Sequence, residues 1–237
     1  MFERDHAIGA GPPRRMQLND EAADYVRELI MTGQLRPGDF IRLDDIARRL
    51  GVSTTPVREG LLALRGDGFV RLEARRGFVV APLSIKDIRD VFVAQGTLAG
   101  ELAARAAATM APAGHAHLAE LQEALEAAAA AGEIGRLEAL NHAFHRHINR
   151  AADAPKIAWL LSVGARYVPR RFYATITGWP DASARDHAAI IAALASGDAD
   201  GARQSMSRHV SHAGELLARH LERADRPGTT TPPGATS

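Results

Sequence analysis

Two short predicted helices joined by a tight turn place the strongest constraint on the fold of this chain. The first carries Ile46 and Leu50 and stops at Gly51, a residue that accepts the left-handed backbone common at helix ends. The second begins within LGVSTTPVREGLLAL (50–64), where the hydroxyl of Ser53 can cap the free N–H groups of the first turn. Pro56 falls in that first turn, where its missing N–H breaks no internal bond.

The second of these helices has two unlike faces. Val57, Leu61 and Leu64 recur at helical spacing and predict one buried stripe. Thr54 and Arg58 lie away from that stripe. A helix whose exposed start is small, hydroxylated and cationic suits a polyanion.

Elements on both sides of this pair extend the pattern. A helix is predicted from Asn19, and RPGDFI (36–41) indicates a turn into a short strand. FVRLEARRGFVVAPL follows and predicts two short β-rich runs around a turn at Arg75, Arg76 and Gly77.

From Ser84 the sequence changes to alanine- and leucine-rich segments, and Ser84 with Asp87 is a plausible helix cap. Helices are predicted over residues 84–110, 113–131, 133–152, 155–172, 183–196 and 198–222. We therefore expect a mainly α protein. Its expected parts are a tail over 1–16, a small α/β domain over 17–82, an all-α helical bundle over 83–224 and a second tail over 225–237.

Composition narrows the class of protein. The chain has 237 residues and a net charge of +1, so any basic surface for a polyanion must be local. Cysteine is absent, which excludes disulfides and thiolate metal sites. The first residues contain no apolar signal-like run, and no segment approaches transmembrane length. These features indicate a cytoplasmic protein without a membrane partner.

Helix, strand, helix, tight turn, helix and hairpin is the order of a winged helix-turn-helix, whose third helix enters the major groove of DNA. The stretch LDDIARRLGVSTTPVREGLLALRGDGFVRLEARRGFVV resembles the N-terminal domain of GntR-type bacterial transcription regulators. The resemblance places two residues, Arg76 and Gly77, at the wing tip. It implies DNA contacts from Ser53, Thr54, Thr55 and Arg58. The alternative is that these arginines are solvated surface charges.

One residue departs from the pattern of that family. Its members usually have an arginine where this chain has Thr54, and that arginine often reads a guanine. Threonine cannot make the bidentate contact to guanine O6 and N7. The resemblance therefore implies a different base at that point of the operator, or a greater reliance on Arg58 and on phosphate contacts.

Ten histidines raise the question of a metal site. On three separate predicted helices, one imidazole each shares a face with apolar residues: His145, His187 and His209. Asn141 lies one turn before His145, so both side chains can reach one point. A single inward histidine is usually a hydrogen-bonded core residue, but an apolar core gains nothing from three imidazoles unless something pairs them.

The second part of the chain resembles the FCD effector domain of the FadR branch of the GntR family. The matching segments are NHAFHRHI (141–148), RDHAAIIAALASGDADGA (185–202) and MSRHV (206–210). The resemblance implies a divalent metal ion, with zinc or nickel as the preferred ion, that helps to bind a small carboxylate effector. The implied ligands are Asn141, His145, His187 and His209.

The effector pocket also departs from the family. Its members often carry an arginine and a glutamate at the positions of Gln95 and Ala99. Tyr167 and Arg171 are possible substitutes for the arginine, although structural packing is an alternative for both.

Taken together, these features predict a homodimeric, ligand-responsive transcription regulator. We expect a repressor that binds an inverted-repeat operator in double-stranded DNA and responds to an anionic small molecule. One alternative is the same regulator with a metal-free, histidine-lined pocket. A metallo-enzyme is a further alternative, but the sequence lacks an HExxH pair and an inward carboxylate that could act as a general base.

Overall fold

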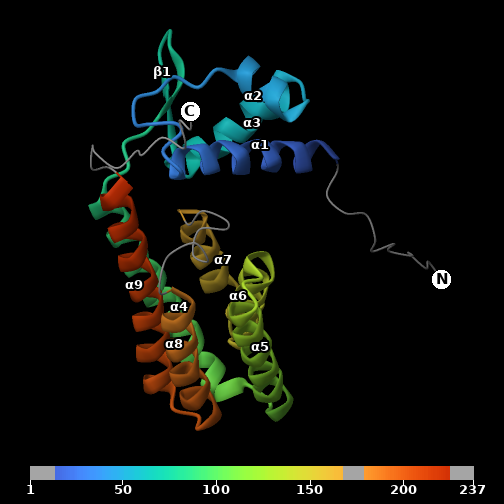
Figure 1. Ribbon diagram of the computed structural model, residues 1–237, viewed down its shortest axis with the longest axis vertical. Coiled ribbons are helices and arrows are strands. Elements are labelled where there is room, and N and C mark those ends of the chain that lie inside the picture. Colours follow the sequence, from blue (N-terminus) through green and yellow to red (C-terminus); the bar gives the residue numbers. More distant parts are fainter. Residues whose placement is uncertain (1–13, 168–178, 225–237) are drawn as a thin grey trace, which may run out of the picture. The chain divides into compact units, whose positions relative to one another are not determined.

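The computed structural model describes residues 14–167 and 179–224. The chain divides between Leu83 and Ser84 into two compact units (Figure 1). Within the described ranges, no helix combines the length and the apolarity needed to cross a lipid bilayer.

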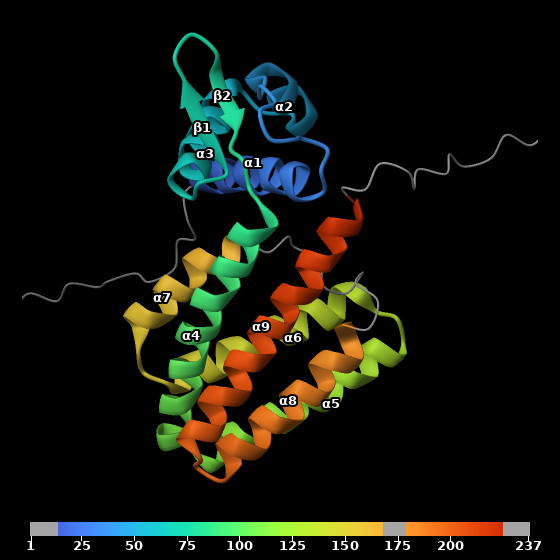
Figure 2. The same cartoon turned by 90° about the vertical axis from the view of Figure 1, so that its left-hand side faces the viewer.

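From residue 14 onward, the first unit has three helices and a two-stranded antiparallel hairpin (Figure 2). Its elements are α1 (Arg14–Met31), α2 (Leu43–Leu50), α3 (Thr54–Gly66), β1 (Val70–Glu73) and β2 (Gly77–Val80). In the hairpin, Val70 lies opposite Val80 and Glu73 opposite Gly77. This order confirms the predicted winged helix-turn-helix.

Two elements of this unit differ from the expectation. Helix α1 begins at Arg14, inside the segment expected to be a tail, because Arg, Met, Gln and Leu are all good helix formers. The strand expected within 36–41 is reduced to a single bridge between Phe40 and Val79. A turn closed by the N–H of Asp39 on the carbonyl of Arg36 leaves too few extended residues for a longer strand.

The turn between α2 and α3 is built as expected except at its cap. Gly51 is in the left-handed conformation with φ of 67° and ends α2. Ser53 is the N-cap residue of α3, but its side chain makes no capping hydrogen bond, contrary to the prediction. Pro56 occupies the third helical position and has no N–H, so the donor that a capping serine commonly uses is missing.

Helix α3 packs tightly on α1. Val57, Leu61 and Leu64 are fully buried, which confirms the predicted stripe. At Gly60 a Cβ atom would lie 2.7 Å from the carbonyl oxygen of Asn19, so only glycine allows the two backbones to approach this closely. Helix α3 packs on α1 through one face, and its opposite face is exposed to solvent.

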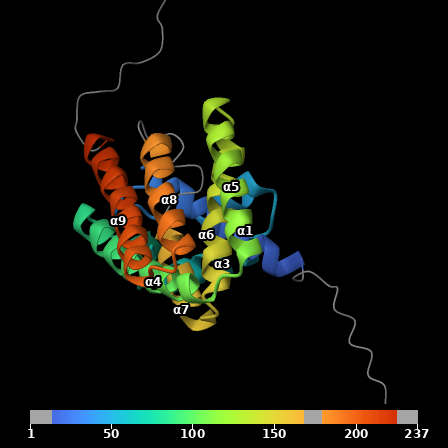
Figure 3. The ribbon, with the colours of Figure 1, turned by 90° about the horizontal axis from the view of Figure 1, so that it is seen from below.

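The second unit is entirely helical over its described residues. Its elements are α4 (Ile85–Thr109), α5 (Pro112–Ala130), α6 (Ile134–Ala151), α7 (Pro155–Gly164), the 3₁₀ turn η1 (Ala165–Tyr167), α8 (Trp179–Ala195) and α9 (Ala199–Ala224). Figure 3 shows α4, α8 and α9 as one group, and α5 pairs with α6. Ser84 and Asp87 form the predicted capping box at the start of α4.

Two helix boundaries in this unit were predicted wrongly. Helix α7 ends at Gly164 and gives way to η1, whereas the prediction ran to residue 172, of which 168–172 lie outside the described ranges. Helix α8 begins at Trp179 and not at Ser183. Pro180 falls in its first turn, where a missing N–H costs nothing, so this proline favours the earlier start.

Small residues set the spacing of the core. Helix α4 lies against α9, and a Cβ atom at Gly100 would meet Ser207 Oγ at 2.3 Å. The buried side chains of Leu102, Phe144 and Ile190 complete one apolar cluster between α4, α6 and α8. This close packing brings the inward faces of α6, α8 and α9 to one region.

Candidate functional site

The exposed start of α3 is the first candidate site. Ser53, Thr54, Thr55 and Arg58 are all exposed, whereas Val57 beside them is fully buried. The buried residue fixes the first turn against the body of the unit. The polar side chains therefore face solvent from a rigid helix end.

The turn of the hairpin presents the other predicted contact residues. Arg75 and Gly77 both adopt positive φ, 65° and 87°, which closes the tight turn between β1 and β2. The exposed guanidinium of Arg76 lies 3.1 Å from Glu73 Oε2. Since exposed ion pairs contribute little stability, Arg76 can exchange this partner for another anion at small cost.

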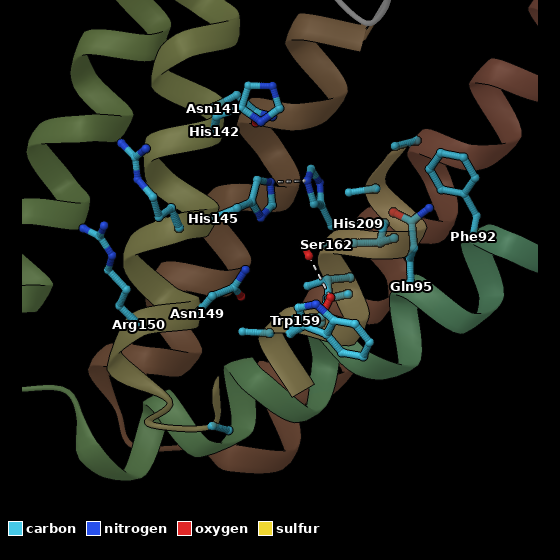
Figure 4. A pocket seen from close by; sticks show the side chains of 18 of the residues that line it. Phe92, Gln95, Asn141, His142, His145, Asn149, Arg150, Trp159, Ser162 and His209 are labelled. Carbon is cyan, nitrogen blue, oxygen red and sulfur yellow. Dashed lines mark hydrogen bonds between the residues drawn. The ribbon is translucent and has the colours of Figure 1, made fainter. Parts of the chain in front are cut away.

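The second candidate site is a cavity of about 740 Å³ inside the helical unit (Figure 4). Its described walls come from α4, α6, α7, α8 and α9 and include the residues Phe92, Gln95, Ala99, Asn141, His145, Asn149, Arg150, Trp159, Trp179 and His209. The predicted ligands Asn141, His145 and His209 thus line one cavity.

Three imidazoles meet beside this cavity, and two of them, His145 and His209, line it, whereas His187 does not. His145 on α6, His187 on α8 and His209 on α9 each offer a ring nitrogen, and these nitrogens lie within 4.8 Å of one another. His145 Nε2 and His209 Nε2 are 3.2 Å apart, and Figure 4 shows the two rings pointing toward each other. His187 is fully buried and stacks on Phe144.

Gln122 on α5 sets the tautomer of His187. Its Nε2 donates to Glu126, so its Oε1 is the atom that faces His187 Nδ1 at 2.9 Å. His187 must then donate from Nδ1, which leaves a lone pair on Nε2, and the hydroxyl of Ser183 lies 3.4 Å from that atom. A metal-binding histidine commonly has its second nitrogen held in this way.

Asp186 lies beside His209 in a comparable position. Its Oδ2 is 3.4 Å from Nδ1 of His209 and 3.2 Å from Nδ1 of His212. The first separation is longer than an ordinary N–H···O bond, so this contact is mainly electrostatic. The two imidazoles, His209 first, hold the pKa of the Asp186 carboxyl below its usual value.

The local environment keeps two rings of the cluster uncharged. Burial lowers the pKa of His145 and of His187 well below the usual histidine value, and the neighbouring imidazoles act in the same direction. Neutral imidazole is the form that binds metal ions. His145 and His187 are therefore in their ligating state at neutral pH.

The residues fit a divalent ion by two further criteria. Zinc–nitrogen bonds of about 2.0–2.1 Å at tetrahedral angles put two nitrogens about 3.3 Å apart, close to the 3.2 Å between His145 and His209. The amide oxygen of Asn141 is buried and has no hydrogen-bond partner. A buried oxygen of this kind normally has a partner, and a cation at the cluster would supply one.

The predicted effector residues have different surroundings. Gln95 lines the cavity, but its amide nitrogen donates to the carbonyl of Gly164 at 3.1 Å. Tyr167 in η1 is half-buried and is not among the described residues that line the cavity. Arg171 lies outside the described residues.

Sequence reasoning missed Gln122, Asp186 and the polar wall formed by Asn149 and Arg150. Gln122 interrupts the buried stripe of α5, and an isolated amide on an apolar face is a usable signal. Asp186 directly precedes His187 in the chain. Its link to His209 on another helix arises only from the tertiary packing.

Two family models match this chain. The model of bacterial regulatory proteins of the gntR family matches residues 18–80, and that of the FCD domain matches residues 90–212, just over half of the chain. The chain is a GntR-family regulator with an FCD domain. Both resemblances predicted from the sequence are thereby confirmed, and this family consists of transcription regulators and not of enzymes.

Several regulators are similar to this GntR protein. A probable D-xylose utilization operon transcriptional repressor of Paenarthrobacter nicotinovorans is 29% identical over 202 residues, which cover 83% of this chain and 87% of that protein. The repressor RspR of Escherichia coli is 23% identical over 203 residues, with coverage of 84% and 89%. An uncharacterized regulator of Mycobacterium tuberculosis is 36% identical over 93 residues, and the match spans only 38% of its length.

Solved structures share the fold of this GntR protein. McbR/YncC of E. coli superposes with a TM-score of 0.67 at 22% identity and covers 86% of this chain and 98% of its own. A GntR family member from Pseudomonas syringae gives a TM-score of 0.55 at 24% identity, with coverage of 90% and 89%.

Proposed function

We propose that this protein is a DNA-binding transcription repressor that responds to a small anionic molecule. The observation that carries the proposal is the exposed, hydroxylated and cationic start of α3 in a winged helix-turn-helix. As a bacterial DNA-binding protein it acts in the cytoplasm. The effector favours one of two arrangements of the protein that differ in affinity for DNA.

In the proposed complex, α3 enters the major groove and the hairpin turn lies along the flanking backbone. Arg58 is the cation of α3 best placed to read a base, because Thr54 cannot make the bidentate contact to guanine. Ser53 and Thr55 contribute hydroxyls to phosphates or base edges. Arg76 and the backbone of Gly77 in the hairpin turn contact phosphate.

Selection of duplexes from a random DNA library tests this proposal. The full-length protein should enrich an inverted repeat whose half-sites lie about one helical turn (~34 Å) apart, as two-fold related recognition helices require. Recovery of sequences with no common motif would contradict it.

The second part of the proposal is a divalent ion, zinc or nickel, held by His145, His187 and His209 with Asn141 as a further ligand. The ion would supply positive charge for a carboxylate effector. Two neighbouring residues hold the proposed ligands in place. Gln122 orients His187, and Asp186 faces the outer nitrogen of His209.

A metal-free pocket is the competing possibility, and the distance that fits a zinc ion also fits it. A hydrogen bond from His145 Nε2–H to the lone pair of His209 Nε2 also accounts for their separation of 3.2 Å. Elemental analysis of protein purified without an affinity tag decides between the two. About one zinc or nickel per chain supports the ion, and a metal-free protein that stays empty after exposure to both ions supports the alternative.

We further propose that the protein is a homodimer through α7 and the neighbouring part of α4. Helix α7 is apolar on most of its surface, yet none of its residues is buried. Val93, Trp159 and Leu160 are 63%, 61% and 49% exposed. A second copy of the chain would cover this surface.

A further inference from the structure

We infer that the effector is a monoanion with an apolar, aromatic-sized body, whose single carboxylate lies beside His145 and His209 on the α6 side of the cavity. The inference rests on the proposed effector role of this cavity and adds the chemical class of the molecule. It excludes, as good ligands, molecules that carry a second carboxylate on the apolar body.

The cavity is divided into a polar and an apolar part. Figure 4 shows Asn149 and Arg150 of α6 at one side, Phe92 and Gln95 of α4 at the other, and the pair His145 and His209 between them. The two arginines of the described walls, Arg146 and Arg150, both come from α6. A carboxylate has suitable partners at this side and at the histidines.

The walls from α4 and α7 provide neither a cation nor a free hydrogen-bond donor for a second anion, among the residues described. Among the described residues that line the cavity, neither helix contributes a lysine or an arginine. The amide nitrogen of Gln95 is engaged by Gly164, and the hydroxyl of Ser162 donates to the carbonyl of Trp159 at 2.7 Å. A second carboxylate would lose its water here without gaining a donor, which is strongly unfavourable.

The size and lining of the whole cavity suit a ligand that contains a ring. Phe92, Trp159 and Trp179 all line the cavity, and the volume of about 740 Å³ lies in the range of about 300–1,000 Å³ that holds drug-sized ligands. An apolar body in contact with these aromatic side chains would be removed from water on binding. A small hydroxy acid would leave this space unfilled.

The two tryptophans provide the test. They are the only tryptophans of the chain and both line the cavity, so their fluorescence reports a bound ligand. The probes for the zinc-loaded full-length protein are 3-phenylpropionate and 3-(4-carboxyphenyl)propionate, which differ only in a second carboxylate on the ring. Citrate and succinate complete the set.

We expect 3-phenylpropionate to bind at least ~10-fold more tightly than each of the other three. In 3-(4-carboxyphenyl)propionate the second carboxylate has to be buried unpaired against α4 and α7. Succinate and citrate have no apolar body to fill that part of the cavity. Equal or tighter binding of any di- or tricarboxylate overturns the inference and leaves the metal and effector proposal standing. If none of the four binds, the inference also fails, and the zinc content of the same sample shows whether the proposed metal site fails with it.

Substitutions at Gln95 test the cause of the selectivity. Gln95→Arg should bring the affinity for 3-(4-carboxyphenyl)propionate to within about threefold of that for 3-phenylpropionate, because it adds a cation to the apolar part. Gln95→Met is the matched control, since it removes the bond to Gly164 without adding charge, and it should keep the wild-type selectivity. If both variants, or neither, lose the selectivity, the absence of a cation at this position is not its cause.

Discussion

At the scale of single residues, Arg58 carries the proposed sequence readout. It is exposed on the first turns of α3, directly after the buried Val57. Arg58→Ala should reduce discrimination between operator and scrambled DNA by ~1–3 kcal/mol, the usual loss for a base contact. Gel shifts with both duplexes measure it. Arg65→Ala, an exposed arginine in the last turn of the same helix, serves as the control and should keep the discrimination.

Arg76→Ala separates a phosphate contact from the base contact proposed for Arg58. The guanidinium of Arg76 faces solvent on the hairpin turn, where a phosphate is the expected partner. Removing it should weaken binding to all sequences alike and lower the salt dependence by about one counterion. If Arg58→Ala behaves in the same way as Arg76→Ala, α3 does not read bases through Arg58.

Asn141 is the weakest of the proposed metal ligands because its amide oxygen carries no formal charge. Asn141→Asp should raise zinc affinity by about tenfold, since a carboxylate adds charge at the same point. Competition with a fluorescent chelator measures the change. Asn141→Leu should lower the affinity, and equal affinities for all three proteins would remove Asn141 from the ligand set.

The buried imidazoles also predict how stability depends on pH. In metal-free protein, folding lowers the pKa of His145 and His187, so the unfolded chain takes up protons that the folded chain does not. Stability should therefore be complete above about pH 6.5 and fall as the pH drops below it, by up to ~1.4 kcal/mol per pH unit for each histidine.

Urea unfolding of chelator-treated protein between pH 5 and 7.5 measures this slope. Both tryptophans lie in the helical unit, so their fluorescence follows that unit alone. His187→Phe should roughly halve the slope. A stability that does not change over this range would show that the imidazoles are not held neutral.

The inward histidines could be predicted from sequence, but their partners could not. A helix repeats every 3.6 residues, so the face occupied by His145, His187 or His209 follows from its apolar neighbours. Gln122 and Asp186 act on rings of other helices, and that pairing depends on how the helices pack.

At the scale of elements, α7 is the helix whose surroundings in a single chain fit its sequence least well. It is apolar but has no buried residue. Leu160→Asp should convert the proposed dimer to a monomer, because a carboxylate in the interface would lose its water without a partner. Sedimentation velocity measures the change, and Ala119→Asp on the exposed face of α5 is the control. A dimer that survives Leu160→Asp places the interface elsewhere.

Helix starts show what local signals can and cannot predict. The Ser84 cap was predictable because Asp87 offers both an N–H and a carboxylate at the third position. The Ser53 cap was not formed because proline holds that position. At α8 the signal of Pro180 outweighed that of Ser183. Side-chain type at the cap is therefore insufficient without the residue three positions later.

At the scale of the whole molecule, the change of composition near Pro82 coincides with the boundary between the two units. Local sequence predicts each unit because each has its own apolar core. The proposed coupling between an effector in the helical unit and DNA binding by the first unit is a difference between two states of the full chain. Local sequence patterns report on each folded unit and not on the free-energy difference between the two states, so the coupling could not be predicted from them.

The central claim is that this chain binds a specific DNA sequence. Fluorescence anisotropy of the full-length protein on the duplex enriched from a random library, and on a scrambled duplex of equal base composition, tests it directly. At the same salt concentration the enriched duplex should bind at least ~10³-fold more tightly. Equal affinity for the two duplexes would contradict the account.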